Sequence, residues 1–379
     1  MMTTIKIRLE PNNIQKSKLF QSAGTARWAY NWTLAKQREN YKSGGKFISD
    51  NDLRKELTQL KKTDELKWLN SISNNIPKQA IKDACGAFIK FFKGKSGFPK
   101  FKKRNKSTLS FYNDVAKLKV TMTHVKIEKV GYIKLSESSR IPIGDRITGM
   151  YSNPRITYDG LNWYISVGID IKNPIVKLTK ESIGIDVGIK DLAICSNIEK
   201  PFKNINKTEK VKILNKKLCR LQRKVSKKYK KNKEGEKFRK TSNIIKLEKK
   251  IKKVYKKLNN IKTDYRHKVA TEIVKTKPSR IVMEDLNIKG MMKNRHLSKA
   301  IAQQSLYEFK TMIKYKSNKC GIEFIEANRW YPSSKTCSHC GHIKSKLSLS
   351  ERIFICEKCG TEIDRDKNAS INLSRYKAS

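Results

Sequence analysis

The chain has 379 residues, of which 37% are hydrophobic, so it is long enough for two or three domains with buried cores and too apolar to be disordered as a whole. Its 85 lysines and arginines against 34 aspartates and glutamates give a formal net charge of +51 at pH 7. So large a charge repels itself unless a polyanion binds, which favours nucleic acid over the alternative partner, a membrane surface. We find no apolar run of 18 residues, no lipidation motif and no secretory signal, and therefore expect no membrane partner and a cytoplasmic location.

Alternating apolar residues open the chain. Ile5, Ile7 and Leu9 predict a strand over Thr4–Glu10. Helical patterns follow, roughly over Asn13–Tyr41, Asn51–Lys61 and Pro77–Lys93. The segment up to about residue 107 is therefore expected to be mostly helical.

A basic segment, Lys93–Lys106, ends this helical region. It has seven basic residues and no acids, it includes Phe98 and Phe101, and glycines and a proline break it. Basic and aromatic side chains together suit a phosphate backbone with bases stacked beside it, whereas a plain solvated loop is the alternative. We take four residues of the segment as candidate nucleic-acid contacts: Lys100, Lys102, Lys103 and Arg104.

Between about residues 108 and 175 the apolar period changes to two, which is typical of half-buried strands. Three groups follow this period: Val125 and Ile127, then Ile133 and Leu135, then Ile165, Val167 and Ile169. Asp159-Gly160 is a tight-hairpin signal, because glycine adopts positive φ at little cost. We predict an antiparallel β unit, most simply a small barrel. If the first strand joins it, the helical segment is an insertion into this barrel.

One carboxylate, Asp186, lies within an apolar strand pattern, Ile183–Val187. An unpaired buried charge costs several kcal/mol, so the pattern predicts a partner for this acid, and a metal ion is one. Gly184 and Gly188 would let backbone, metal and phosphate approach closely. A turn and a second strand come next, and Asp191, past the turn, is expected to be solvated.

Residues 203–260 contain 24 lysines and arginines and four glutamates. Their apolar residues recur at steps of three and four, which predicts two helices that pack along a narrow seam. The seam residues are Leu214, Leu218, Leu221 and Val225 in the first helix, and Ile244, Leu247, Ile251, Val254, Leu258 and Ile261 in the second. We predict a helical hairpin at 203–262 whose basic outside faces nucleic acid; a solvated coiled coil is the alternative.

The last third alternates strands and helices. We expect strands at Ser279–Glu284 and Ile322–Ile325, and helices at Leu297–Asn318 and from about Asp364 to Tyr376. Two C-x-x-C pairs lie between the last strand and the last helix, at Cys337, Cys340, Cys356 and Cys359. Four thiolates at this spacing are typical of one tetrahedral zinc ion, and a site filled by four sulfurs is structural rather than catalytic. The other four cysteines stand singly and are expected to be reduced.

Three acids lie at the ends of predicted elements. Asp186 is in one strand, Glu284 ends another, and Asp366 opens the last helix. If the fold brings them together, they would repel one another without cations, whereas two Mg²⁺ ions would complete a site for phosphodiester hydrolysis. The alternative for each acid alone is a solvated element end, and Asp364 could simply cap the last helix.

Several stretches, in this order, resemble the TnpB family, whose members are transposon-encoded, RNA-guided DNA endonucleases related to type V CRISPR effectors. They are G-I-D-V-G-I-K-D-L-A, I-V-M-E-D-L-N, C-S-H-C-G with C-E-K-C-G, and D-R-D-K-N-A-S-I-N-L. The N-terminal R-W-A-Y-N-W and G-F-P-K-F-K-K-R are similar to that family too. Ser370 departs from its commoner alanine.

The resemblance implies a multidomain α+β protein. It implies a RuvC-like, RNase H-type nuclease domain at 177–329 and 362–379, with the basic hairpin 203–262 inserted and a zinc-ribbon target-nucleic-acid-binding module at 330–361. It further implies a wedge β-barrel domain at 1–9 and 108–176, into which a helical recognition domain at 10–107 is inserted. Asp186, Glu284 and Asp366 would be the catalytic, magnesium-binding acids.

The function so implied is RNA-guided cleavage of double-stranded target DNA beside a short adjacent motif, with a guide RNA from the transposon end and two catalytic Mg²⁺ ions. Lys78 and Gln79 are candidates for reading that motif, by position. Such proteins act at the prokaryotic nucleoid. The alternatives are an RNA-guided DNA-binding regulator without cleavage and an accessory transposase protein; the presence of all three acids favours the nuclease.

Overall fold

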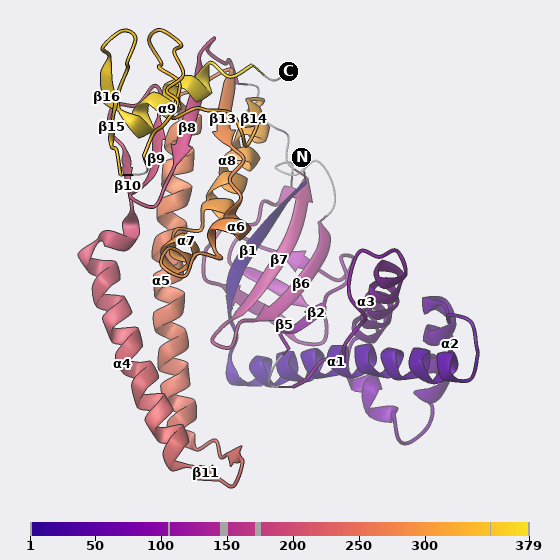
Figure 1. The fold of residues 1–379 in the computed structure, drawn as a ribbon. Helices are drawn as coiled ribbons and strands as arrows, with labels where there is room; N and C mark the ends of the chain where they lie inside the picture. Colours follow the sequence, from indigo (N-terminus) through magenta and orange to yellow (C-terminus); the bar gives the residue numbers. More distant parts are fainter. Residues whose placement is uncertain (1, 105–106, 145–150, 171–175, 349, 378–379) are drawn as a thin grey trace. The chain divides into compact units, whose positions relative to one another are not determined.

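The computed structural model describes residues 2–104, 107–144, 151–170, 176–348 and 350–377 (Figure 1). The chain folds into two compact units, Met1–Lys172 and Asn173–Ser379. Within the described ranges, no helix combines the length and the apolar character that crossing a bilayer requires.

The first unit contains a seven-stranded antiparallel sheet with β1 (Met2–Glu10) at its centre. The strand order is β2-β6-β7-β1-β5-β4-β3. The other strands are β2 (Leu109–Tyr112), β3 (Lys119–Val120), β4 (His124–Ile127), β5 (Gly131–Leu135), β6 (Ser152–Tyr158) and β7 (Trp163–Asp170). The predicted hairpin at Asp159-Gly160 joins β6 to β7, and Gly160 has a φ of 90° there. Among the described residues no ladder joins the outer strands β2 and β3, so the barrel stays a prediction.

The helices of the first unit lie between β1 and β2 in the chain. They are α1 (Asn13–Lys42), α2 (Asp50–Leu60), the 3₁₀ helix η1 (Lys67–Ser71) and α3 (Asn75–Phe92). A capping box fixes the start of α1, since Asn12 accepts from the Gln15 N–H and the Gln15 side chain accepts from the Asn12 N–H. Apolar residues of α1 and α3 share one core with the sheet. The helical segment is therefore packed on the sheet rather than held apart from it.

The second unit is built on a five-stranded sheet in the order β10-β9-β8-β13-β14. Its strands are β8 (Ser182–Val187), β9 (Asp191–Cys195), β10 (Phe202–Lys203), β13 (Arg280–Glu284) and β14 (Glu323–Ala327). β8, β9 and β10 pair antiparallel, and β13 pairs parallel with both β8 and β14. The carboxyl ends of β8, β13 and β14 therefore meet at one edge of the sheet.

The predicted basic hairpin is present as α4 (Glu209–Lys231) and α5 (Ser242–Lys275), joined at the tip through β11 (Lys233–Glu234) and β12 (Lys237–Phe238) (Figure 1). Its seam includes Leu218, Val254 and Leu258. The second helix does not end at residue 262, however. It continues to Lys275, because its apolar residues there pack into the core beneath the sheet.

A left-handed residue divides the helix that was expected at Leu297–Asn318. Ser305 has φ 55° and ψ 50°, so α7 (Ser298–Gln304) ends there and α8 (Leu306–Cys320) begins. The remaining elements are η3 (Ile205–Lys207), α6 (Ile288–Met291), the hairpin of β15 (Ile353–Ile355) with β16 (Glu362–Asp364), and α9 (Arg365–Ser374). Asp364 caps α9 by accepting from the N–H groups of Asp366 and Lys367.

Candidate functional site

The fold brings the three predicted acids to one cavity of about 730 Å³ in the second unit. Asp186 is the last residue but one of β8, and Glu284 ends β13, which pairs in parallel with β8 through Met283 and Ile185. Asp366 is in the first turn of α9, which packs against β8. Three elements that are far apart in the sequence thus deliver carboxylates to the same cavity wall.

The charges around Asp186 oppose its ionisation. Burial, reinforced by the negative charges of Glu284 and Asp366, raises the pKa of Asp186 well above its usual value. Arg365 and a backbone N–H lower it only in part. Around Asp186 itself, the negative charges of Glu284 and Asp366 outweigh the positive charge of Arg365, and a divalent cation bound among the three acids would relieve this local excess.

Two neighbours hold the other acids in place. Arg365 donates to Asp366 Oδ1 through Nε and Nη2, at 3.2 and 3.1 Å. The hydroxyl of Ser333, a residue that is 2% exposed, donates to Glu284 Oε1. Ser333 belongs to the segment that precedes the first cysteine pair. The structure therefore connects the cysteine-rich module to the second acid, a contact that no sequence pattern had indicated.

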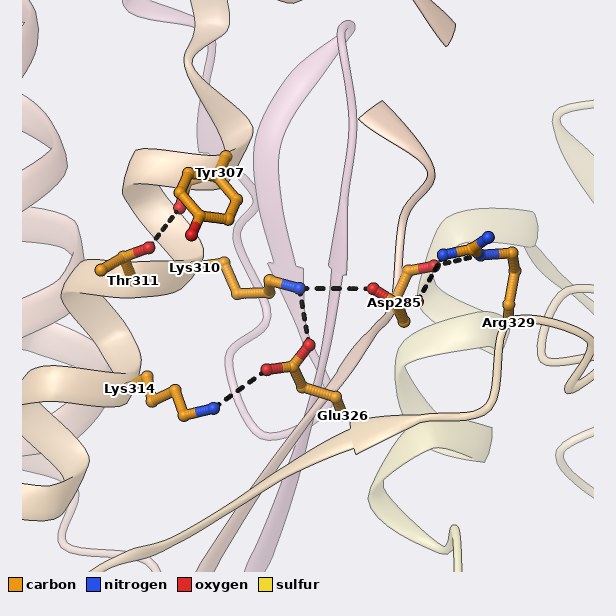
Figure 2. Close-up of polar contacts among 7 residues, drawn as sticks. All are labelled: Asp285, Tyr307, Lys310, Thr311, Lys314, Glu326 and Arg329. Carbon is orange, nitrogen blue, oxygen red and sulfur yellow. Dashed lines mark hydrogen bonds and ion pairs between the residues drawn. The ribbon is translucent and has the colours of Figure 1, made fainter. Parts of the chain in front are cut away.

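The acid that follows Glu284 has a different role. Asp285 accepts from Arg329 Nη2 at 2.6 Å and pairs with Lys310 Nζ at 3.5 Å (Figure 2). Lys310 also donates to Glu326, which Lys314 contacts in turn (Figure 2). The hydrogen bond from Arg329 holds the pKa of Asp285 below its usual value. This ion-pair network connects α8 to β14 and to the residue after β13. Asp285 therefore has structural partners, whereas its neighbour Glu284 lines the cavity.

Asp191, expected to be solvated, is buried instead, and that prediction is wrong. It begins β9 in the wall of the same cavity, with Lys203 Nζ 3.6 Å from its Oδ1. Gln304 Nε2 donates to its backbone oxygen at 3.4 Å. The turn after β8 is tight enough to bring Asp191 back under neighbouring segments rather than out into solvent.

Gly184 is needed for packing, and the prediction that it lets backbone approach closely is confirmed for the backbone of α9. A Cβ on Gly184 would lie 2.0 Å from the backbone oxygen of Ser370 and 2.3 Å from the backbone nitrogen of Ser374, both on α9. A Cβ on Gly188 would meet only Asp191 O, at 3.6 Å. The absent side chain thus lets the helix with Asp366 lie directly on the strand with Asp186.

Side chains of α9 hold the first cysteine pair in place. Asn368 Nδ2 donates to Thr336 O at 2.7 Å, and its Oδ1 accepts from the Ser338 N–H at 2.9 Å. One turn later Asn372 Nδ2 donates to the backbone oxygens of Ser333 and Thr336. The two asparagines are four residues apart and thus on one face of α9, a spacing in D-R-D-K-N-A-S-I-N that could have predicted their shared role.

The four predicted zinc ligands do meet. Their sulfur atoms all lie within 4.8 Å of one another. Within the described residues, this is the one group of three or more histidine, cysteine, aspartate or glutamate side chains whose ligand atoms gather this closely. Cys337 Sγ lies 3.7 Å from Cys359 Sγ, and Cys340 Sγ lies 3.6 Å from Cys356 Sγ. Sulfurs about 2.3 Å from a tetrahedral zinc ion would be about 3.8 Å apart, so the four residues fit zinc.

The knuckle turns follow the usual geometry of such sites. Gly341 and Gly360, at φ 77° and 70°, donate backbone N–H bonds to Cys337 O and Cys356 O. Hydrogen bonds from Thr361 lower the pKa of the Cys359 thiol to about 6, whereas burial and the neighbouring cysteine thiols raise the pKa of Cys340 to about 12. The four remaining cysteines are all free, as expected.

The predicted nucleic-acid contacts of the first unit divide into two groups. Lys78, Lys100, Lys103 and Arg104 are exposed, and Lys78 lines a cavity of about 390 Å³ with Lys61, Lys62 and Lys67. Gln79 instead donates to Asp83 Oδ1 at 2.8 Å, and the Lys102 ammonium lies over the Tyr30 ring at 3.8 Å. Asn31 also binds the Lys102 backbone through both amide atoms. Gln79 and Lys102 thus have structural partners, and Asn105 and Lys106 lie outside the described residues.

Three family models match separate segments of the chain. Residues 166–295 match the family described as "Probable transposase", the OrfB family of IS605; residues 307–373 match "Cas12f1-like, TNB domain"; and residues 1–46 match a "Helix-turn-helix domain" of OrfB. In this structure the last of these segments forms β1, α1 and the residues just after them.

Two curated relatives match along nearly the whole chain. "Putative RNA-guided DNA endonuclease InsQ" of Escherichia coli K12 is 28% identical, over 98% of this chain and 91% of the relative. A "Putative RNA-guided DNA endonuclease" of Streptomyces pristinaespiralis is 29% identical, over 97% and 87%. Mimivirus proteins named TnpB-like are 33% identical over 34% of this chain.

Solved structures agree on the fold. The Cas12f1 chain of a complex with sgRNA and target DNA aligns with a TM-score of 0.60 and 16% identity, covering 99% of this chain and 98% of that one. Cas_phi3, a mini-RNA-guided endonuclease, aligns with a TM-score of 0.50 and 12% identity, over 99% and 92%. The chain therefore has the fold of Cas12-type effectors, and its sequence is similar to that of OrfB-type insertion-sequence proteins. Within that class, the family models and the relatives that match along nearly the whole chain support the TnpB family.

Proposed function

We propose that this protein is an RNA-guided DNA endonuclease that hydrolyses phosphodiester bonds of target DNA at the cavity of Asp186, Glu284 and Asp366. The observation that carries the proposal is the arrival of these three acids at one cavity from three separate elements. The names of the full-length relatives support guided DNA cleavage. The strand order of the second unit, three antiparallel strands with two parallel ones beside the first, supports the RNase H-type nuclease fold.

The donor set suits magnesium. Carboxylate oxygens are the ligands that Mg²⁺ prefers, and the excess negative charge that raises the pKa of Asp186 is the kind that a divalent ion relieves. Two such ions, when bound, would supply an attacking hydroxide and stabilise the leaving oxygen. Because β13 pairs with β8 and α9 packs against β8, Asp186 lies on the element that the other two acids share as a neighbour, and we assign it the central position.

The chain's own residues prepare the cavity for this chemistry. Ser333 fixes one oxygen of Glu284, and Arg365 fixes Asp366. Cations also line the wall and would bind the phosphodiester: Lys190, Lys207, Lys335, Arg352 and Arg365. Apolar residues such as Leu306 and Leu347 complete the lining and limit water. The cavity thus combines acids that would hold the metal ions with basic residues that would bind the phosphodiester.

The proposed partners are a zinc ion, a guide RNA and double-stranded target DNA. A zinc ion bound by the four cysteines would keep the segment from Ser333 to Ser338 in the position that α9 and Glu284 require. A guide RNA from the transposon end and double-stranded target DNA would share the basic surface that gives the chain its net charge of +51. The exposed Lys78, Lys100, Lys103 and Arg104 remain proposed contacts, with Lys78 close to the adjacent motif.

The test is to purify the protein with RNA transcribed through the 3′ end of its gene and to offer a plasmid that matches the guide. We expect cutting that needs Mg²⁺ and that disappears in Asp186→Ala, while guide and target are still bound. Equal cutting without guide RNA would refute guidance. Guide-dependent binding by the wild-type protein without any cutting would instead identify the non-cleaving regulator.

A further inference from the structure

A second cavity, of about 400 Å³, lies between α5 and the α7–α8 corner of the same unit. Three of its residues carry positive charge, and one carries negative charge. The lining residues are Asn259, Lys262, Thr263 and Arg266 from α5, and Lys299, Ala302, Gln303, Ser305 and Glu308 from the corner. None of the predicted catalytic or zinc-binding residues is among them, so this cavity is distinct from both sites described above.

Arg266 is a buried cation with an incomplete set of partners. Its side chain is only 5% exposed, while that of its carboxylate partner Glu308 is 60% exposed. Nη2 donates to Glu308 Oε2 at 2.7 Å and to Thr263 Oγ1 at 3.2 Å. Nε is buried and has no hydrogen-bond acceptor among the residues that the structure describes. A buried guanidinium with an unsatisfied N–H and one solvent-weakened ion pair is short of negative charge.

Lys262 adds a second positive charge without an acidic partner. It is half-buried, one turn before Arg266 on the same face of α5, and its ammonium has no acid within ion-pair distance in the described parts of the chain. Burial, reinforced by the charge of Arg266, lowers the pKa of Lys262. Lys299, exposed on α7, is likewise without an ion-pair partner there. The cavity therefore holds three cations and one acid, a net charge of about +2.

The backbone at the junction of α7 and α8 adds to the positive potential of the cavity. Ser305 has φ 55°, a left-handed conformation that non-glycine residues rarely adopt. Its hydroxyl donates to Ala302 O and does not cap α8. The 15-residue helix α8 thus begins at the cavity wall without a side-chain cap. The acid in its first turn, Glu308, is paired with Arg266, so the free N–H groups of this helix start can still attract an anion.

We propose that this cavity binds one backbone phosphate of the bound nucleic acid, with Lys262, Lys299 and Arg266 as its cationic ligands. A phosphodiester offers two charged oxygens, which suits a forked guanidinium flanked by two ammonium groups. The identity of the anion as part of a nucleic acid rests on the proposed function. The position of the cavity, where the basic hairpin enters the core, would fix a strand that runs along α5.

The test measures acetylation of Lys262 by mass spectrometry in the full-length protein. The lowered pKa leaves more neutral amine on Lys262, so this lysine should label readily when the cavity is free. Lys268, exposed on another side of α5 and paired with Asp264, is the internal control. The protein is labelled alone, with inorganic phosphate, with the RNA from the gene's 3′ end, and with that RNA and matching duplex DNA.

We expect nucleic acid to slow labelling of Lys262 about fivefold or more, while Lys268 changes little, because an ammonium that is bound to a phosphate is not free to react. Protection by RNA alone identifies a guide phosphate, and protection only after DNA is added identifies a target phosphate. Protection by inorganic phosphate but by neither nucleic acid, or no protection at all, would overturn the proposal.

A binding measurement gives a second, independent reading. The double variant Lys262→Gln/Lys299→Gln should weaken nucleic-acid binding about tenfold at low salt and reduce the slope of log affinity against log salt by about one. Lys268→Gln removes a charge from the same helix and should leave the slope within error of the wild type. Unchanged affinity in the double variant would count against the site. Neither readout needs DNA cutting, so a protein that binds without cleaving still gives a result.

Discussion

The two candidate metal sites of the second unit are assembled in opposite ways. The four thiols come from two tight turns between residues 337 and 359, and each turn is closed by its own backbone hydrogen bonds. The three acids come from β8, β13 and α9 and line one cavity only when the sheet and its covering helix are complete. The zinc site therefore depends on local geometry, whereas the acid site depends on long-range packing.

The two sites are nevertheless linked through α9. The helix provides Asp366 to one site, and through Asn368 and Asn372 it binds the backbone beside the other. Ser333, held by Asn372, contacts Glu284. Some substitutions should therefore affect one site alone, and others should affect both.

The largest effect is expected from the acids themselves. Glu284→Gln removes a charge from the cavity and should slow cleavage at least about 10³-fold, in line with the loss of a catalytic carboxylate elsewhere. Asp285→Asn makes the same chemical change one residue later, in the ion-pair network of Figure 2. It should retain cleavage and lose about 1 kcal/mol or less of stability, since these pairs are partly exposed. Rates of plasmid cutting and thermal unfolding separate the two; equal loss of cutting in both variants would contradict the assignment.

Loss of zinc should come next. Cys337→Ser should abolish zinc binding, release the segment that holds Ser333, and slow cleavage about 10- to 100-fold, as outer-sphere changes at metal sites do. Cys219→Ser, at an exposed single cysteine on α4, is the matched control. Metal analysis should find about one zinc per wild-type chain. Full cutting by a zinc-free protein would show that the two sites are independent.

The contact between α9 and β8 can be tested through stability. Gly184→Ala should destabilise the protein by about 1–3 kcal/mol, because its Cβ would overlap the backbone of Ser370 and Ser374. Gly188→Ala, just past the end of the same strand, meets only an ordinary contact at 3.6 Å and should be close to neutral. Urea unfolding of both variants measures the difference. A neutral Gly184→Ala would mean that α9 does not rest on β8 as described.

The smallest effect is expected at the connection between the sites. Ser333→Ala removes one hydrogen bond to Glu284, worth about 1 kcal/mol, and should slow cleavage about fivefold while raising the Mg²⁺ concentration for half-maximal cutting. A purely structural role would not change the Mg²⁺ requirement. The rise of melting temperature on adding Mg²⁺, weaker in the variant, is a readout without cutting. Ser350 lies in the same module, and its hydroxyl contacts Ser348 rather than one of the three acids, so Ser350→Ala should behave as the wild type.

The difference in assembly also explains what the sequence could predict. Cysteine spacing alone predicts the four-cysteine site, because short turns fix the relative positions of two ligands with two residues between them. The positions of Asp186 and Glu284 at strand ends follow from the apolar patterns, and their approach follows from parallel pairing, which a family resemblance could anticipate. The burial of Asp191 and the packing of Gly184 depend on which segments cover them, and no local pattern encodes that. Ser305 is similar: its left-handed conformation breaks a helix that propensity alone would continue.

Helix α5 has a mechanical consequence. It is one unbroken helix of 34 residues, about 50 Å long. Its first half forms the basic hairpin, and Val269, Ala270 and Ile273 near its other end pack in one cluster with Ile183 and Ile185 of β8. Because a helix resists bending, a strand bound at the hairpin tip would be connected through one rigid element to the packing beneath the strand that carries Asp186.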